Sequence, residues 1–101
     1  MGLFSSLFGK SAKQDRIIEM INNGGIILDV RTQQEFKQGH VQGSKNIPLD
    51  TINQKMKDIK KLNKPIILCC ASGMRSGQAT TILKREGLDV INGGSWRSLA
   101  N

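Results

Sequence analysis

The chain has 101 residues, of which 38% are hydrophobic and 23% are charged, and its formal net charge at neutral pH is +7. A chain of this length and composition is typical of a single globular domain and is too short for a second hydrophobic core. Because it contains no run of about eighteen apolar residues or more, we expect no membrane-spanning helix.

The opening segment, "MGLFSSLFGK", carries two apolar pairs one helical turn apart. Its basic residue follows the apolar residues, which is the reverse of a secretory signal. Gly2 and Ser6 match the short pattern for N-myristoylation, so a weak interfacial anchor is one alternative. We interpret residues 1–12 as a tail, flexible or weakly packed, and expect no membrane contact. A single domain is expected over residues 13–101.

The first half of the domain alternates between helical and extended patterns. Apolar residues at helical spacing predict a helix within residues 14–25, closed by a glycine in the left-handed conformation. The continuous apolar run "IILDV" (26–30) is typical of a strand covered on both faces. A short helix is expected over residues 32–38, ending at Gly39, and a brief strand over 44–48.

The second half repeats this alternation. It predicts a helix in "TINQKMKDIKKL" (51–62), a buried strand in "PIILCC" (65–70), a helix in "SGQATTILKREG" (76–87) and a last strand in "LDVIN" (88–92). Strands separated by helices of this length imply a parallel sheet with right-handed crossovers. We therefore predict a three-layer α/β fold, with a parallel sheet of four to five strands and helices on both faces.

Five lysines lie between residues 55 and 64, on a segment that also carries an apolar stripe. A basic surface attracts anions. Nucleic-acid binding would favour aromatic residues interleaved with the charge, and this segment has none. We interpret the lysines as the solvated face of a helix and expect no nucleic-acid partner.

The two cysteines, Cys69 and Cys70, are adjacent in the chain. Neighbouring Cα atoms lie about 3.8 Å apart, which is below the range of a relaxed disulfide. Free thiols are typical of a reducing compartment, so we expect a cytoplasmic protein.

The segment "CCASGMRS" (69–76) joins the second buried strand to the next helix. Ligands of such sheets bind beyond the carboxyl ends of the strands, where Cys70 lies. Small loop residues let several backbone N–H groups turn inward, and with the amino end of the helix they form an anion cradle. Lowering a cysteine pKa from about 8.5 to about 6 takes roughly 3.4 kcal/mol and yields a reactive thiolate.

Arg75 offers a fixed, always charged fork that suits an oxyanion. Counted from Cys69, the spacing to Arg75 is the one that phosphate-ester cleavage by a thiolate uses; counted from Cys70, the loop is one residue shorter. Spacing alone leaves both registers open, although Cys69 lies inside the expected strand and is interpreted as a packed hydrophobic residue, and Cys70 lies at the anion cradle. The predicted substrate-binding residues are Ala71, Ser72, Gly73, Met74, Arg75 and Ser76.

Three motifs resemble those of rhodanese-like sulfurtransferase domains. The segment "LDVRTQQEFKQGHVQGSKNIPL" is similar to the family signature of Asp-Val-Arg, Glu-Phe, Gly-His, Gly and Asn-Ile-Pro. The segment "CCASGMRS" resembles the active-site loop when Cys70 is its first residue, and "GLDVINGG" resembles the last strand and glycine pair. The resemblance runs from about Arg16 to Gly94, most of the chain.

The resemblance implies a loop cysteine that takes a sulfane sulfur from a small anionic donor such as thiosulfate. The persulfide then passes to cyanide, a thiol or a protein acceptor, without a cofactor, and we expect a monomer. Cys70 is then the nucleophile, the backbone donors of residues 71–75 stabilise it, and Arg75 holds the outgoing oxyanion. The register from Cys70 is favoured, because the phosphatase signature needs a glycine where counting from Cys69 gives Ser72.

The first motif is interpreted mostly as scaffold. Asp29 is expected to pair with Arg31 and brace the neighbouring loops, with Glu35 in the same network; direct contact of Arg31 with the substrate is the alternative. His40 is the only histidine, which excludes a multi-histidine metal site and a conventional triad. We therefore predict no metal ion and a hydrogen-bonded loop role for His40.

Two other functions stay open. One is a persulfide carrier or binding module with little turnover of its own, and the other is a phosphatase-like hydrolase. The segment after the glycine pair is compressed relative to the family, because only Ser95 precedes Trp96. We therefore expect a terminal helix that is short or absent, and we place Trp96 at the edge of the core.

Overall fold

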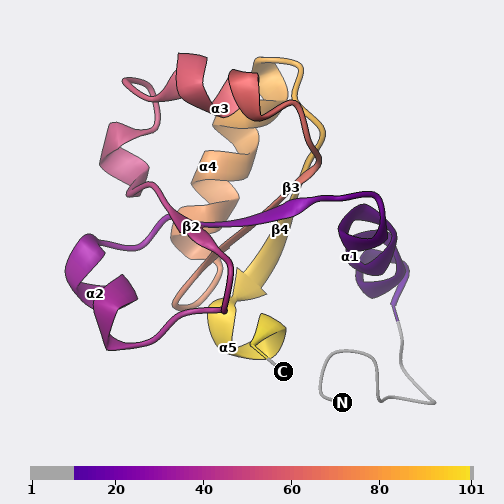
Figure 1. Cartoon of the computed structure of the whole chain (residues 1–101), viewed down its shortest axis with the longest axis horizontal. Coiled ribbons are helices and arrows are strands. Elements are labelled where there is room, and N and C mark those ends of the chain that lie inside the picture. The colour runs from indigo at the N-terminus through magenta and orange to yellow at the C-terminus, as the bar shows by residue number, and fades with distance from the viewer. Residues whose placement is uncertain (1–10, 101) are drawn as a thin grey trace.

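A computed structural model describes residues 11–100 and shows a parallel sheet between helices (Figure 1). Its strands are β1 (Ile26–Asp29), β2 (Lys45–Asn46), β3 (Ile66–Cys70) and β4 (Val90–Ser95). They lie in the order β2-β1-β3-β4, and each neighbouring pair is parallel. The predicted α/β fold is confirmed, with four strands in the part of the chain described. The tail residues Gly2 and Ser6 lie outside it.

The helices follow the predicted alternation. They are α1 (Ala12–Asn22), α2 (Gln33–Gln38), α3 (Met56–Leu62), α4 (Met74–Arg85) and α5 (Trp96–Leu99), with a 3-10 turn, η2, at Leu49–Thr51. Capping boxes open α1, at Ser11, and α2, at Thr32, because each hydroxyl accepts a backbone N–H that the helix leaves without a partner. Between residues 11 and 100, no helix is long and apolar enough to cross a membrane.

The helix predicted over residues 51–62 is wrong in its first part. The chain forms the 3-10 turn η2 and a series of turns, and α3 begins only at Met56. The Thr51 hydroxyl donates to the Pro48 carbonyl at 2.8 Å, which favours the tighter turn. Ile52 is nevertheless fully buried in the same cluster as Ile59. The apolar stripe was therefore identified correctly, although its backbone is irregular.

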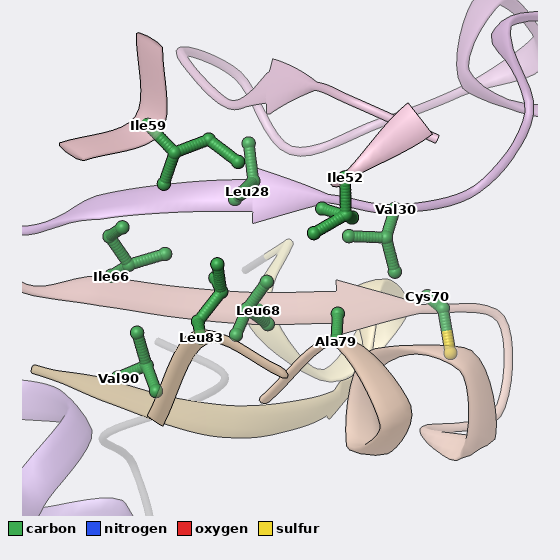
Figure 2. Packing of buried hydrophobic residues seen from close by; sticks show 10 residues of the cluster. All are labelled: Leu28, Val30, Ile52, Ile59, Ile66, Leu68, Cys70, Ala79, Leu83 and Val90. Atoms are coloured by element: carbon green, nitrogen blue, oxygen red, sulfur yellow. The ribbon is translucent and has the colours of Figure 1, made fainter. Parts of the chain in front are cut away.

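Two hydrophobic clusters cover the two faces of the sheet. One lies between the sheet and the α3–α4 side, and Figure 2 shows its ten buried residues: Leu28, Val30, Ile52, Ile59, Ile66, Leu68, Cys70, Ala79, Leu83 and Val90. The other lies on the α1 and α5 side and comprises Ile17, Met20, Val41, Ile67, Cys69 and Leu99. Successive residues of a strand point to opposite faces, which divides β3 between the clusters. The predicted three-layer arrangement is confirmed.

The last strand differs from the prediction because it continues through the glycine pair. The pairing Leu68 with Asn92 is followed by Cys70 with Ser95, so β4 carries one extra residue between these positions. Such a bulge locally redirects a strand and its side chains. The terminal helix α5 is short, as expected, and Trp96 packs against the second cluster, which confirms its predicted place at the core.

Candidate active site

Cys70 is the last residue of β3, at the carboxyl edge of the sheet. Its side chain points toward α4, whereas that of Cys69 belongs to the cluster on the opposite face. Both are free thiols and both are fully buried. Figure 2 shows the sulfur of Cys70 beside the loop that leads into α4. Adjacent residues therefore place their sulfur atoms in separate layers of the molecule.

The Cys70 sulfur is surrounded by hydrogen-bond donors. The Gly73 N–H donates to Sγ at 3.0 Å, and the Ser76 N–H and Ser76 hydroxyl both lie 3.4 Å from it. Burial is the largest single influence on the pKa of Cys70 and acts to raise it. The hydrogen bonds from Ser76, Gly73 and Ser72 act in the opposite direction and together outweigh burial, so the pKa lies below its usual value. The site is built to hold a thiolate.

Gly73 gives the loop its shape. It precedes α4 in the left-handed region, with φ of 102°, and a Cβ atom there would lie 3.3 Å from the Gly94 Cα. A glycine adopts this conformation without steric cost and lets the two backbones approach each other. Its N–H is thereby aimed at Cys70.

The predicted loop residues divide into two groups. The N–H groups of Ser72, Gly73 and Ser76 interact with Cys70. The Met74 N–H instead donates to the Ser72 hydroxyl at 3.4 Å, and the Met74 side chain is 75% exposed. Ala71 is also exposed. The donors on the sulfur thus come from part of the range 71–75 and from Ser76 just beyond it.

Arg75 is held by Glu35 on α2. Its Nη1 and Nη2 donate to the two carboxylate oxygens of Glu35 at 2.7 and 2.9 Å. The hydrogen bonds from Arg75, followed by those from Thr32, lower the pKa of Glu35 to about 2. Both side chains are about one-third exposed, at 36% and 35%. The sequence placed Glu35 in the network of Asp29 and Arg31, and its backbone carbonyl does lie 3.4 Å from Arg31 Nη1 as an acceptor. Its carboxylate, however, orients the arginine of the loop.

Asp29 and Arg31 form the buried pair that the sequence predicted. The Arg31 Nε and Nη2 donate to the Asp29 carboxylate at 2.7 to 3.0 Å, and Nη2 also donates to the Gly39 carbonyl at 2.7 Å. The guanidinium carbon lies 4.6 Å from the centre of the Trp96 ring. These contacts join β1, the loop after α2 and α5, as expected of a brace.

His40 packs on its own segment. Its ring stacks on Phe36 with centroids 3.7 Å apart, and Nδ1 lies 2.7 Å from the Phe36 carbonyl. This is the hydrogen-bonded loop role that we predicted for it.

Asn92 on β4 belongs to the site and was not identified from the sequence. Its amide Nδ2 donates to the Gly73 carbonyl at 3.0 Å, and its Oδ1 lies 2.7 Å from the Ser76 hydroxyl. The signal available was a polar residue immediately before a glycine pair at the carboxyl edge of the sheet. That signal does not specify a partner, because the bulge in β4 sets where the side chain points.

A surface depression of about 260 Å³ adjoins the loop on the side of Arg75. Its lining residues are Val30, Thr32, Pro48, Leu49, Asp50 and Arg75. It is mostly apolar with one charge of each sign, so it offers room for an organic group beside the arginine.

Comparison with known proteins gives the class that this geometry suggests. The sequence model of the Rhodanese-like domain matches residues 13–97. The thiosulfate sulfurtransferase PspE of Escherichia coli is 35% identical over 75 residues, covering 72% of each chain. Among solved structures, a rhodanese from E. coli with anions superposes with a TM-score of 0.67 at 33% identity, covering 75% of this chain and 92% of that one. The chain therefore belongs to the rhodanese-like domain family.

Other relatives place the same domain in longer proteins. The uncharacterized protein YqhL of Bacillus subtilis is 39% identical over 64% of this chain, which spans only 51% of YqhL. The CoADR-RHD protein of Bacillus anthracis superposes with a TM-score of 0.72 at 35% identity over 85% of this chain, but over only 15% of its own length. Members of the family thus occur both as separate domains and as parts of larger chains.

Proposed function

We propose that this chain is a sulfurtransferase in which Cys70 carries a sulfane sulfur from a donor such as thiosulfate to a thiophilic acceptor. The observation that supports this most is the set of donors around Sγ, which favours an ionised sulfur at the carboxyl edge of the sheet. A thiolate needs no general base to attack. The register counted from Cys69 has no such support, because Cys69 faces the opposite layer.

The reaction has two displacements at sulfur. The Cys70 thiolate attacks the outer sulfur of thiosulfate, a sulfur–sulfur bond forms, and sulfite leaves with the electron pair of the bond that breaks. An acceptor thiolate or cyanide then attacks the terminal sulfur of the persulfide, and Cys70 leaves as a thiolate. No net oxidation is required, since each step exchanges one bond to sulfur for another.

Arg75 is suited to the donor's oxyanion. Two of its nitrogens donate to Glu35, and a guanidinium has five N–H groups in total. The ion pair therefore fixes the plane of the guanidinium while N–H groups stay available for a sulfonate. Thiosulfate as the donor is further supported by the relatives PspE and GlpE, both named thiosulfate sulfurtransferases.

The test is mass spectrometry after incubation with thiosulfate. The wild-type chain should gain the mass of one sulfur atom, Cys70→Ser should gain none, and the matched variant Cys69→Ser should still gain it. The added mass should be removed by cyanide, with thiocyanate as the product. A wild-type protein that accepts no sulfur from thiosulfate or another sulfane donor would contradict the proposal.

A persulfide carrier with little turnover is the second candidate. Cys70 is fully buried, which favours slow exchange with small acceptors in solution, and a relative at 36% identity is named a putative sulfur carrier protein, YrkF. Steady-state assays with thiosulfate and cyanide separate the two functions. Turnover of about 1 per second or faster, within the usual enzyme range, supports the transferase. A persulfide that forms but turns over far more slowly supports the carrier.

A further inference from the structure

Asn92 has a fixed orientation in this site. Its Nδ2 donates to the Gly73 carbonyl, and its Oδ1 accepts the Gly94 N–H, each at 3.0 Å. A backbone carbonyl only accepts and a backbone N–H only donates, so the amide cannot be reversed without losing both bonds. Oδ1 therefore faces Ser76 as an acceptor.

The Ser76 hydroxyl has two possible acceptors and one hydrogen. Its Oγ lies 2.7 Å from Asn92 Oδ1 and 3.4 Å from Cys70 Sγ, and Ser76 is fully buried. A hydroxyl donates one hydrogen bond at a time. The distance to Asn92 is ideal for O–H···O, so Asn92 Oδ1 is the better acceptor while the sulfur is neutral, and Sγ lies within reach of the same hydrogen.

We propose that Asn92 is a positioning residue that accepts the hydrogen bond of the Ser76 hydroxyl while Cys70 Sγ is neutral. The same hydroxyl then donates to Sγ when that sulfur carries negative charge. When Sγ is neutral, as a thiol or as the inner sulfur of a persulfide, the hydroxyl donates to Asn92 Oδ1. When Sγ is a thiolate, rotation about the Ser76 Cβ–Oγ bond brings the same hydrogen to the sulfur. Asn92 Oδ1 then keeps the Gly94 N–H as its donor.

The fold builds this contact from two elements. The bulge in β4 lies next to Asn92, and Asn92 pairs with Leu68, a residue of the α3–α4 cluster. On α4, a Cβ at Gly77 would lie 3.3 Å from Asn92 Nδ2, tighter than most such contacts. The absence of a side chain at Gly77 thus gives the Asn92 amide its room against the first turn of α4.

The exchange fits the proposed sulfur transfer, on which this functional interpretation rests. Charge leaves Sγ when the persulfide forms and returns when the acceptor takes the outer sulfur. A donor that follows this charge avoids a buried hydroxyl without an acceptor in either state, which would cost stability. The Ser76 hydroxyl therefore has an acceptor at both stages of the cycle.

Other charged or titratable groups interact with Cys70, and the test treats each of them identically in every variant compared. Arg75 on α4 interacts electrostatically with it and is paired with Glu35 on α2. On β3, Cys69 also interacts with Cys70, and Cys69 has Asp29 and Arg31 beside it. Cys69 is replaced by serine in all four proteins, which differ from one another only at the uncharged residues Ser76 and Asn92, so these contributions cancel between variants.

The experiment is a double-mutant cycle on the pKa of Cys70, read from the ultraviolet absorbance of the thiolate in a Cys69→Ser background. The four proteins carry Ser76 and Asn92, Ser76→Ala alone, Asn92→Ala alone, and both changes. Ser76→Ala should raise the pKa by about one unit, because the thiolate loses a donor. Asn92→Ala is then made in two backgrounds, one with the Ser76 hydroxyl and one with Ser76→Ala. The change in the pKa of Cys70 should be about half a unit more negative in the background that keeps the hydroxyl.

Loss of the Gly73 anchor affects both arms of the cycle equally and so cancels. Equal shifts in the two backgrounds would mean that Asn92 is only structural and would overturn the proposal. If Asn92→Ala does not fold, Asn92→Ser replaces it in the same cycle, because its hydroxyl is too short to span to Ser76. Absorbance needs no sulfur donor, so a coupling can be measured even if sulfur transfer from thiosulfate fails, and the two proposals fail separately.

Discussion

At the end of β3, the two faces of the sheet shift the pKa of a cysteine thiol in opposite directions. On one face, burial raises the pKa of Cys69 to about 12, and the Asp29 carboxylate adds to the effect. On the other face, Cys70 is equally inaccessible, but donors from the loop and α4 hold its pKa below the usual value. Burial alone makes a thiol inert, and oriented dipoles reverse this.

The largest expected effect is the difference in reactivity between a variant that keeps only Cys69 and a variant that keeps only Cys70. In Cys70→Ser, alkylation of the remaining thiol at neutral pH should be at least about a thousandfold slower than alkylation of Cys70 in Cys69→Ser, because a thiol with a pKa of about 12 is almost never ionised. The alkylation rate of Cys70 should rise with pH through a midpoint lower than that of the same cysteine in the unfolded chain, because the hydrogen bonds on Sγ lower its pKa. Rates are measured by mass spectrometry. Comparable rates in the two variants would remove the contrast between the faces.

The next effect is on stability and concerns the brace beside Cys69. Arg31→Leu leaves the Asp29 carboxylate buried without its ion pair, which should lower the free energy of unfolding by about 3–5 kcal/mol. The matched control is Arg16→Leu, which removes ion pairs to Glu19 and Asp89 that water screens, and it should change the free energy of unfolding far less than Arg31→Leu does. Urea unfolding compares the two, and equal costs would mean that Asp29 and Arg31 are not a brace.

A smaller effect distinguishes the backbone conformation that Gly73 requires from the hydrogen bond that its N–H donates to Cys70. Gly73→Ala places a side chain at a positive φ and against Gly94, so it should destabilise the fold by about 1–3 kcal/mol and raise the pKa of Cys70 by about one unit. Gly87→Ala has a similar positive φ with open space around it, so it should cost about 1 kcal/mol and leave the pKa of Cys70 unchanged. Thermal unfolding and thiolate absorbance measure the two effects.

The smallest effect depends on pH. The pKa of Glu35 falls to about 2 in the fold from about 4.3 in an unfolded chain, so its pair with Arg75 stabilises the protein above about pH 4.3 and loses this contribution as the pH falls toward 2. Because both side chains are about one-third exposed, we expect about 1 kcal/mol or less. The difference in unfolding free energy between wild type and Glu35→Gln should therefore shrink from pH 7 to pH 2. A difference independent of pH would exclude this pair as its source.

The sequence predicted those parts of the site that depend on local spacing. The apolar runs of β1 and β3 identified the buried strands, and the position of Cys70 where one of them ends indicated which sulfur meets the loop. The pairing of Asp29 with Arg31 follows from two residues on the same face of an extended segment. Each of these depends on periodicity within a few residues.

The remaining parts depend on contacts between segments far apart in the chain. Glu35 and Arg75 are 40 residues apart, and Ser76 and Asn92 are 16 apart. No local pattern specifies either pair, because the first depends on how α2 packs beside the loop and the second on the bulge in β4. The start of α3 was mispredicted for a related reason, since burial of Ile52 is compatible with turns as well as with a helix.

The stacking of Arg31 on Trp96 gives the protein a built-in optical reporter. The chain contains one tryptophan and no tyrosine, so its intrinsic fluorescence comes from this ring alone. The indole lies against the Arg31 guanidinium and packs on the α1 and α5 side of the sheet, whereas Cys70 belongs to the other side. Its emission should therefore follow the integrity of that layer during unfolding, while chemistry at the reactive sulfur can be monitored separately by absorbance in the same cuvette.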